Sequence, residues 1–449
     1  ALADSLAVFD PTYTATQWQQ RLWECYERVA DKKPKKHDRA WRLFRQALTH
    51  SQLERLRSFP YFNNKHISTG LTTESESRRL KPYGSMASRS IGFVGRDANC
   101  NELRGHSGLE LALDSLLYGI PGHTRRVQVT NNIIDLADIE PPVPGYDITT
   151  TINVALQDIV EVELSKMLQE TDAQWGSAIL MEVATGEIKA ISNLRRSKDN
   201  PDQFVEGINN AVTGYEPGSV MKPISMMVAL EDGIVTNIDE PMATGTSFTY
   251  CGKTIRDPHG GPSLTPREII ATSSNVGMTK IILKRYESRP GKFRDRLEEM
   301  GFFEPFNTGI AGEQVPFVRR LGNRSEDRLD LTRMAFGYAT HLPPLRTLAM
   351  YNAMANDGKY VRPHLVKRLS RDGQPDSIVP ITYIRDQVCS PENAQKLRIM
   401  LRDVVTNQRG TGYRALHDSK VALAGKTGTV FEVDPETRTH THRRRLTFC

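Results

Sequence analysis

The chain has 449 residues, with 59 lysines and arginines against 53 aspartates and glutamates, which gives a net charge of +6. This length predicts two or three domains and is ample for a full hydrophobic core. The net charge is small for the size and argues against a dedicated nucleic-acid binder, whose basic patch would dominate its domain. The sequence contains neither a run of about 18 apolar residues nor a signal-peptide pattern.

Cysteine and histidine usage predicts no metal centre. The cysteines are odd in number and widely scattered: Cys25, Cys100, Cys251, Cys389 and Cys449. Their spacing fits neither a zinc site nor a dense disulfide framework, so they do not reveal the redox compartment. The histidines form no cluster with ligand spacing. We therefore expect no metal site from these residues.

The first part of the chain, residues 1 to about 135, is polar and rich in Arg, Lys and Gln. Apolar periodicity predicts helices near 16–30 and 38–57, and a third from about 107 to 118 that ends at a glycine. A proline-rich stretch at 135–145 then interrupts all periodicity. We interpret this stretch as the connector between two domains.

Beyond the connector, apolar residues between Leu156 and Leu168 recur on one face of a predicted helix. Alternating residues from Ser177 to Ser192, with a turn at 184–187, predict a β-hairpin. We expect residues from 219 to about 371 to be mainly helical.

Three short motifs follow one another in the second part of the chain. They are Ser219-x-x-Lys222, Ser273-x-Asn275 and Lys426-Thr427-Gly428, and a further threonine, Thr429, follows the third. Separately, each has an ordinary explanation, as an exposed helix start, a helix cap and a strand edge or turn. Together and in this order, they match the signature set of serine acyltransferases that react with penicillin.

The chemistry explains why these residue types are required. A serine hydroxyl is a weak nucleophile and needs a base within hydrogen-bond reach. If Ser219 opens a helix, Lys222 lies one turn later on the same face, and Pro223 is tolerated because it falls in the first turn. A lysine acts as a base only when it is neutral, so burial or a second cation must lower its pKa. Lys426 is the candidate for that cation.

The remaining motif residues predict how a peptide is held. Ser273 can relay a proton between Lys222 and a substrate nitrogen, and the amide of Asn275 can bind a peptide backbone. The third motif reads as a strand edge, where Gly428 allows a substrate backbone to come close. The backbone amides of Ser219 and Thr429 are candidates for an oxyanion hole.

With these motifs, the chain resembles the class B penicillin-binding proteins. The segment from Gly105 to Gly122 is similar to the Gly-x-x-Gly-Leu-Glu…Asp-x-x-Leu-x-Gly-x-x-Gly pattern of their non-catalytic pedestal domain. Glu216-Pro-Gly-Ser219 and the Asn at position 275 look more like the FtsI division type, because the elongation type usually carries Asp there.

The resemblance implies an α+β fold. A pedestal domain at 1–135 and a linker at 136–146 would precede a transpeptidase domain at 147–449, in which an antiparallel sheet is flanked by helices as in serine β-lactamases. The family's sheet needs a further strand and a C-terminal helix after the Lys-Thr-Gly hairpin. We therefore expect this domain to be truncated at Cys449.

The resemblance also implies a reaction. Ser219 would attack the penultimate D-alanyl carbonyl of a peptidoglycan stem peptide, and an amine from a neighbouring stem would resolve the acyl-enzyme into a cross-link. Lys426, Thr427 and Thr429 would bind the terminal carboxylate, and β-lactams would acylate Ser219. The implied reaction requires no metal and no organic cofactor. The implied partners are stem peptides, β-lactams and a membrane-embedded glycan polymerase of the FtsW type. The implied location is the periplasm, on a single-pass inner-membrane anchor outside this chain.

Three alternatives stay open at the level of sequence. A serine β-lactamase shares the motifs but is a compact single domain without a pedestal. A D,D-carboxypeptidase would resolve the acyl-enzyme with water. A non-catalytic divisome scaffold or β-lactam sensor would bind without turnover; the intact motifs argue against the scaffold, and the pedestal argues against the sensor.

Overall fold

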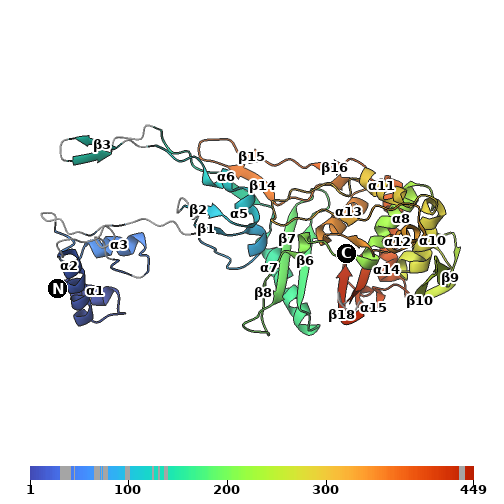
Figure 1. The fold of residues 1–449 in the computed structure, drawn as a ribbon, viewed down its shortest axis with the longest axis horizontal. Coiled ribbons are helices and arrows are strands. Elements are labelled where there is room, and N and C mark those ends of the chain that lie inside the picture. Colours follow the sequence, from blue (N-terminus) through green and yellow to red (C-terminus); the bar gives the residue numbers. More distant parts are fainter. Residues whose placement is uncertain are drawn as a thin grey trace. The chain divides into compact units, whose positions relative to one another are not determined.

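The computed structural model describes residues 1–30, 42–44, 46–64, 71, 73, 79–96, 102–123, 126–129, 132–135, 140–433 and 440–449. The chain forms two compact units, Ala1–Leu80 and Lys81–Cys449 (Figure 1). The predicted linker at 136–146 lies within the second unit, and its residues 136–139 are outside the described ranges. No helix in the described ranges is both long and apolar enough to cross a bilayer.

The first unit is built from three helices: α1 (Leu2–Phe9), α2 (Ala15–Ala30) and α3 (His50–Arg57). Leu6, Trp18 and Leu56, one from each helix, are at most 1% exposed and form its small core. The helix predicted at 16–30 is confirmed by α2.

The helix predicted at 38–57 is only partly confirmed, because α3 begins at His50. Thr49 caps this helix by accepting a hydrogen bond from the backbone N–H of Gln52, and the Gln52 side-chain oxygen accepts one from the backbone N–H of Thr49. Such a capping box marks a helix start. Residues 38–41 and 45 lie outside the described ranges.

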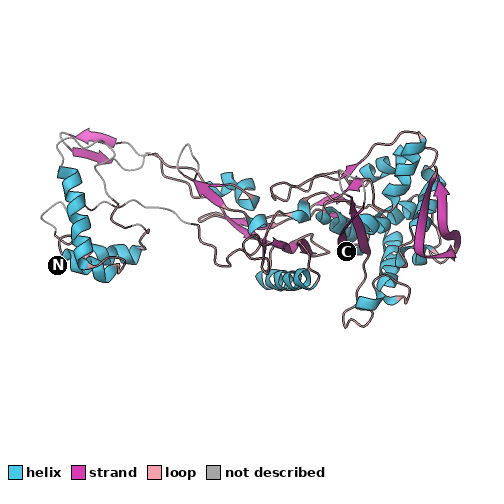
Figure 2. Cartoon of the chain, turned by 60° about the horizontal axis from the view of Figure 1, so that its bottom comes forward, coloured by secondary structure: helices cyan, strands magenta, loops and turns pink. Residues whose placement is uncertain are grey.

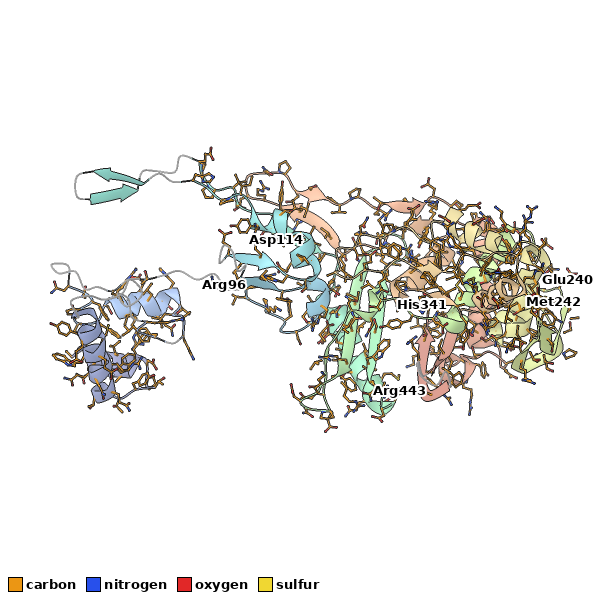
Figure 3. All side chains as sticks on the ribbon, in the orientation of Figure 1. Arg96, Asp114, Glu240, Met242, His341 and Arg443 are labelled. Atoms are coloured by element: carbon orange, nitrogen blue, oxygen red, sulfur yellow. The ribbon has the colours of Figure 1, made fainter. Side chains whose placement is uncertain are left out.

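The second unit begins with short elements: α4 (Ser88–Ile91), β1 (Val94–Arg96), β2 (Leu103–Gly105), α5 (Gly108–Ala112), α6 (Asp114–Tyr118), β3 (Arg126–Val129) and β4 (Asn132–Asp135). The single helix predicted from 107 to 118 is thus two helices, divided at Leu113. The Asp114 carboxylate, labelled in Figure 3, accepts from the Gly105 backbone at 2.7 Å and pairs with Arg104 at 3.1 Å. These bonds tie the start of α6 to the neighbouring strand β2.

The rest of the second unit combines antiparallel strands and helices, as the predicted α+β class requires. The next elements are β5 (Asp147–Thr150), α7 (Val154–Glu170), β6 (Trp175–Met181), β7 (Ile188–Arg196) and β8 (Phe204–Glu206). Strands β6, β7 and β8 form an antiparallel sheet in that order, which confirms the predicted hairpin. Helix α7 packs against β7.

The helical body contains η1 (Asn210–Val212), η2 (Gly218–Met221), α8 (Lys222–Glu231), α9 (Pro266–Ala271), α10 (Asn275–Tyr286), α11 (Gly291–Glu299), α12 (Ser325–Ala335), α13 (Pro344–Ala355), α14 (Pro391–Thr406) and α15 (Tyr413–Leu416). Helix α8 is buried from Lys222 to Leu230. A helix that is apolar on all sides belongs inside a core. Helices α10, α14 and the turn η2 pack against it (Figure 1).

Two long hairpins accompany these helices: β9 (Met242–Tyr250) with β10 (Lys253–Leu264), and β17 (Thr427–Val433) with β18 (His440–Phe448). The shorter strands are β11 (Phe317–Val318), β12 (Thr340–His341), β13 (Tyr360–Val361), β14 (Val366–Ser370), β15 (Ser377–Ile378) and β16 (Tyr383–Arg385). Hairpin β9–β10 corrects the expectation that 219–371 is mainly helical. Its two strands stand beside the helices at one end of the body (Figure 2). Its threonine, serine and glycine content conceals the apolar alternation that marks a half-buried strand.

Candidate active site

Ser219 lies in the one-turn 3₁₀ helix η2, and Lys222 is the first residue of α8. Pro223 falls in the first turn of α8, as predicted. The predicted single helix opened by Ser219 is instead a tighter turn that continues into an α-helix. Gly218 makes this turn possible, because its φ of +60° is a conformation that favours glycine and a Cβ there would lie 2.6 Å from Val430 Cγ2.

The amine end of Lys222 contacts the second motif. Lys222 Nζ donates to Ser273 Oγ at 2.9 Å and to the Ser273 carbonyl at 2.5 Å, and the side chain is fully buried. Burial holds the pKa of Lys222 well below its ordinary value, and the nearby charge of Lys426 lowers it further, while Asp257 opposes both. A neutral amine in contact with a hydroxyl can accept and return a proton. Ser219, three residues before Lys222 in the chain, is half-buried.

Ser273 precedes α10 in the left-handed conformation, with φ of +60°. Ser274 then caps the helix by accepting from Gly277 N at 2.8 Å. Asn275 is the first helical residue and is half-buried. The second motif is therefore a strained turn followed by a helix start, and residues in this conformation persist only where surrounding contacts hold them.

Asp257 on β10, which the sequence motifs do not indicate, holds the residues that follow Ser273. Its carboxylate, 6% exposed, accepts from the Ser274 hydroxyl, from Asn275 N at 2.7 Å and from Val276 N at 3.2 Å. An anion at a helix N-terminus is favoured by the helix dipole as well as by these bonds. Its partners are mostly backbone groups more than fifteen residues away, which leave no signature in the sequence.

The third motif begins with Lys426, one residue before strand β17, and continues on that strand, which pairs with β18. Lys426 exchanges backbone hydrogen bonds with Cys449, at 2.7 and 3.1 Å, and its fully buried side chain donates to the Thr427 carbonyl at 3.0 Å. Burial lowers the pKa of Lys426 to about 7. The strand edge predicted from the sequence is thus present.

Gly428 brings the third motif against the first. It is buried, and a Cβ at this position would lie 3.1 Å from Val220 Cγ1 and 3.3 Å from the Pro217 carbonyl. The strand can pass this close to the Ser219 turn because glycine has no side chain. Thr427 is half-buried beside it, and Thr429 is exposed.

The geometry therefore brings the three motifs together. Lys222 and Ser273 are in direct contact, Lys426 acts on Lys222 through its charge, and Gly428 packs on the Ser219 turn. Among the described contacts, Lys222 donates to Ser273 and not to Ser219. Hydrogen bonds of this kind are often loose without substrate and tighten when it binds.

Two family models match the chain. The penicillin binding protein transpeptidase domain matches residues 176–449, and the penicillin-binding protein dimerisation domain matches residues 3–150. The chain therefore belongs to the penicillin-binding protein transpeptidase family.

Several known proteins are similar to it. Penicillin-binding protein PbpB of Mycolicibacterium smegmatis is 30% identical over 379 residues, which are 81% of this chain and 56% of that protein. Peptidoglycan D,D-transpeptidase FtsI of Escherichia coli K12 is 26% identical over 377 residues, 82% of this chain and 59% of that one. The chain thus spans less than two thirds of these relatives. The crystal structure of penicillin-binding protein 3 from Mycobacterium tuberculosis, complexed with aztreonam, aligns with a TM-score of 0.67 and 25% identity, covering 83% of this chain and 80% of that chain.

Proposed function

We propose that this protein is a peptidoglycan D,D-transpeptidase that works through an acyl-enzyme on Ser219. The observation that carries the proposal is the fully buried Lys222, with its lowered pKa and its hydrogen bond to Ser273. A buried lysine without a bonded carboxylate is suited to a neutral base, and a neutral base is what a serine nucleophile requires. The named relatives and the matched family are consistent with this chemistry.

In the first half-reaction, Ser219 Oγ attacks the penultimate D-alanyl carbonyl and its proton passes to Lys222 Nζ. The backbone amides of Ser219 and Thr429 would stabilise the oxyanion. The C–N bond then breaks, and the proton reaches the leaving nitrogen through Ser273, so that D-alanine departs as a neutral amine. The acyl group stays on Ser219 as an ester.

In the second half-reaction, the amine of a neighbouring stem peptide attacks the ester carbonyl. Lys222 takes a proton from this amine and returns one to Ser219 Oγ as the C–O bond breaks. The product is a new amide cross-link, and the serine is regenerated. A β-lactam enters the first half-reaction in the same way but keeps its leaving nitrogen tethered, which leaves Ser219 acylated.

Substrate binding is assigned to the third motif and Asn275. Lys426, Thr427 and Thr429 would hold the terminal carboxylate, and the Asn275 amide would hold the peptide backbone. The lowered pKa of Lys426 fits this role. Burial alone brings this pKa to about 7, and an arriving carboxylate would favour the charged form of the lysine.

The finer assignments follow from the resemblance. We infer a pedestal at 1–135, a linker at 136–146 and a transpeptidase domain at 147–449, with the division role of FtsI-type relatives. The dimerisation-domain match over 3–150 supports a non-catalytic first part. The inferred partner is a membrane-embedded glycan polymerase of the FtsW type, and the inferred location is the periplasmic side of the inner membrane.

Product analysis tests the reaction class. The protein is incubated with a stem pentapeptide and an acceptor amine, and the products are resolved by mass. A cross-linked amide is the expected product. Release of tetrapeptide alone would make the protein a carboxypeptidase, and binding of penicillin without either product would make it a scaffold or sensor.

A further inference from the structure

The turn between α14 and α15 carries a hydroxyl that reaches the third motif. Thr411 Oγ1 lies 2.6 Å from Thr427 Oγ1, within hydrogen-bond distance. Thr411 is exposed, and Thr427 is half-buried. The pair is therefore at the surface of the site, where a ligand can reach it.

The backbone of the same turn is tied to the second motif. Thr411 N donates to the carbonyl of Ala271, two residues before Ser273, at 3.0 Å. Gly412 N donates to the Val404 carbonyl at 3.0 Å, and Gly410 N donates to the Asn407 carbonyl at 2.7 Å. These bonds hold the turn on both sides of Thr411, so the backbone from which the hydroxyl extends has a fixed position. Through Thr411, the segment entering the second motif and the strand of the third motif are joined.

Only one proton can lie between the two hydroxyls. If Thr427 donates its proton to Thr411, it presents only lone pairs to a substrate carboxylate, and the two acceptors repel each other. If Thr411 donates to Thr427, the Thr427 proton is free to point to the carboxylate, and each bond polarises the next. The contact allows either hydroxyl to donate, and a bound carboxylate favours the second arrangement, in which Thr411 is the donor.

We propose that Thr411 is a positioning residue that orients the Thr427 hydroxyl as a donor and so makes the site selective for ligands that end in a carboxylate. This inference rests on the proposed function, in which Thr427 binds the carboxylate. Thr411 touches Thr427 and need not touch the substrate.

The test compares a penicillin with its methyl ester, using the second-order rate constant of acylation. Thr411→Val keeps the shape and removes the hydroxyl, and it should slow acylation by the free acid on the order of 3- to 10-fold, the worth of one hydrogen bond. Acylation by the ester should change much less. Thr411→Ser should retain the wild-type preference for the acid. In a Thr427→Val background, Thr411→Val should add nothing.

Each contrary result has a separate meaning. If Thr411→Val slows acylation by acid and ester equally, Thr411 is merely structural. Equal rates for wild type and Thr411→Val would overturn the inference. So would the full slowing by Thr411→Val in the Thr427→Val background. If Thr427→Val keeps the full wild-type preference for the acid over the ester, the carboxylate site of the proposed function is wrong. Thermal unfolding of each variant confirms that it is folded.

Discussion

Lys222 Nζ and Ser273 Oγ lie 2.9 Å apart, although 51 residues separate them in the chain. The contact depends on two local features, the turn at Gly218 that delivers α8 and the carboxylate of Asp257 that holds the start of α10. Each feature gives a prediction, and each has a matched control elsewhere in the protein.

Gly218→Ala should abolish acylation and destabilise the protein. The substitution introduces a side chain at φ +60° and puts its Cβ 2.6 Å from Val430 Cγ2. Gly233→Ala is the control, because Gly233 has φ +68° and a Cβ added there would meet no atom within 4 Å. The free energy of unfolding of the control should fall by only about 1–2 kcal/mol, because alanine is disfavoured in the left-handed conformation, and its acylation rate should not change. Denaturant unfolding measures the stability of the two variants, and labelling with fluorescent penicillin measures their acylation. An equal loss of stability and acylation in the two variants would contradict the role of close packing at Gly218.

Asp257→Ala should lower both stability and acylation, because it leaves a buried hydroxyl and two backbone N–H groups without their acceptor. The free energy of unfolding should fall by an amount on the order of 2–4 kcal/mol. The stability and acylation rate of Asp257→Asn should lie between those of the wild type and of Asp257→Ala. Asp239→Ala is the control, since this carboxylate is 65% exposed and pairs with Arg267 at the surface, where such pairs contribute about 0–1 kcal/mol. The prediction fails if Asp257→Ala acylates at the wild-type rate.

Lys426→Met should shift the pH dependence of acylation. Burial is the larger cause of the lowered pKa of Lys222, and the Lys426 charge is the second. Removing that charge raises the pKa of Lys222, so its neutral form appears at higher pH and the acid limb of the rate profile moves to higher pH. The midpoint of the limb is the readout, since the absolute rate also reflects carboxylate binding. An unmoved midpoint in the variant would show that the two lysines are not coupled.

Glu206, at the contact between the 87–90 segment and strand β8, should make the stability of the protein depend on pH. Its carboxylate accepts from the backbone of Arg89 at 3.1 Å and of Asn193 at 3.2 Å, while Glu161 accepts from Ala87 N at 3.0 Å. Burial, the largest cause, raises the pKa of Glu206 from 4.5 to about 7. The folded protein therefore binds this proton more tightly than the unfolded chain does.

The sign follows from that difference in proton binding. The free energy of unfolding should fall as the pH rises from 4.5 to about 7 and be insensitive to Glu206 above that. Over this pH range the free energy of unfolding should change by an amount on the order of 2–3 kcal/mol. Glu206→Gln should remove this slope, and Glu163→Gln, at an exposed position on α7, should keep it. Denaturant unfolding at several pH values measures it, and an equal slope in Glu206→Gln would exclude this carboxyl as the source.

The short motifs of the sequence name residues whose placement the structure shows, while their catalytic roles stay predictions. Ser219, Lys222, Ser273 and Lys426 could be identified together because an activated serine requires a base, a relay and a cation, and their order is a recognisable pattern. The β6–β7 hairpin could also be predicted, because period-2 alternation is a local property.

The remaining features depend on contacts that are distant in sequence. Asp257 acts on backbone N–H groups of α10, and any residue type at those positions offers the same donor. The β9–β10 hairpin has too little apolar alternation to predict its strands. Thr411 matters only because the fold brings it beside Thr427, sixteen residues along the chain.

The acyl group on Ser219 can be located by intact-mass measurement and peptide mapping after treatment with penicillin. We expect one adduct of the mass of penicillin, located on the peptide that contains Ser219 and absent from Ser219→Ala. A folded Ser219→Ala protein that still forms the adduct, or an adduct mapped to another residue, would rule out Ser219 as the nucleophile.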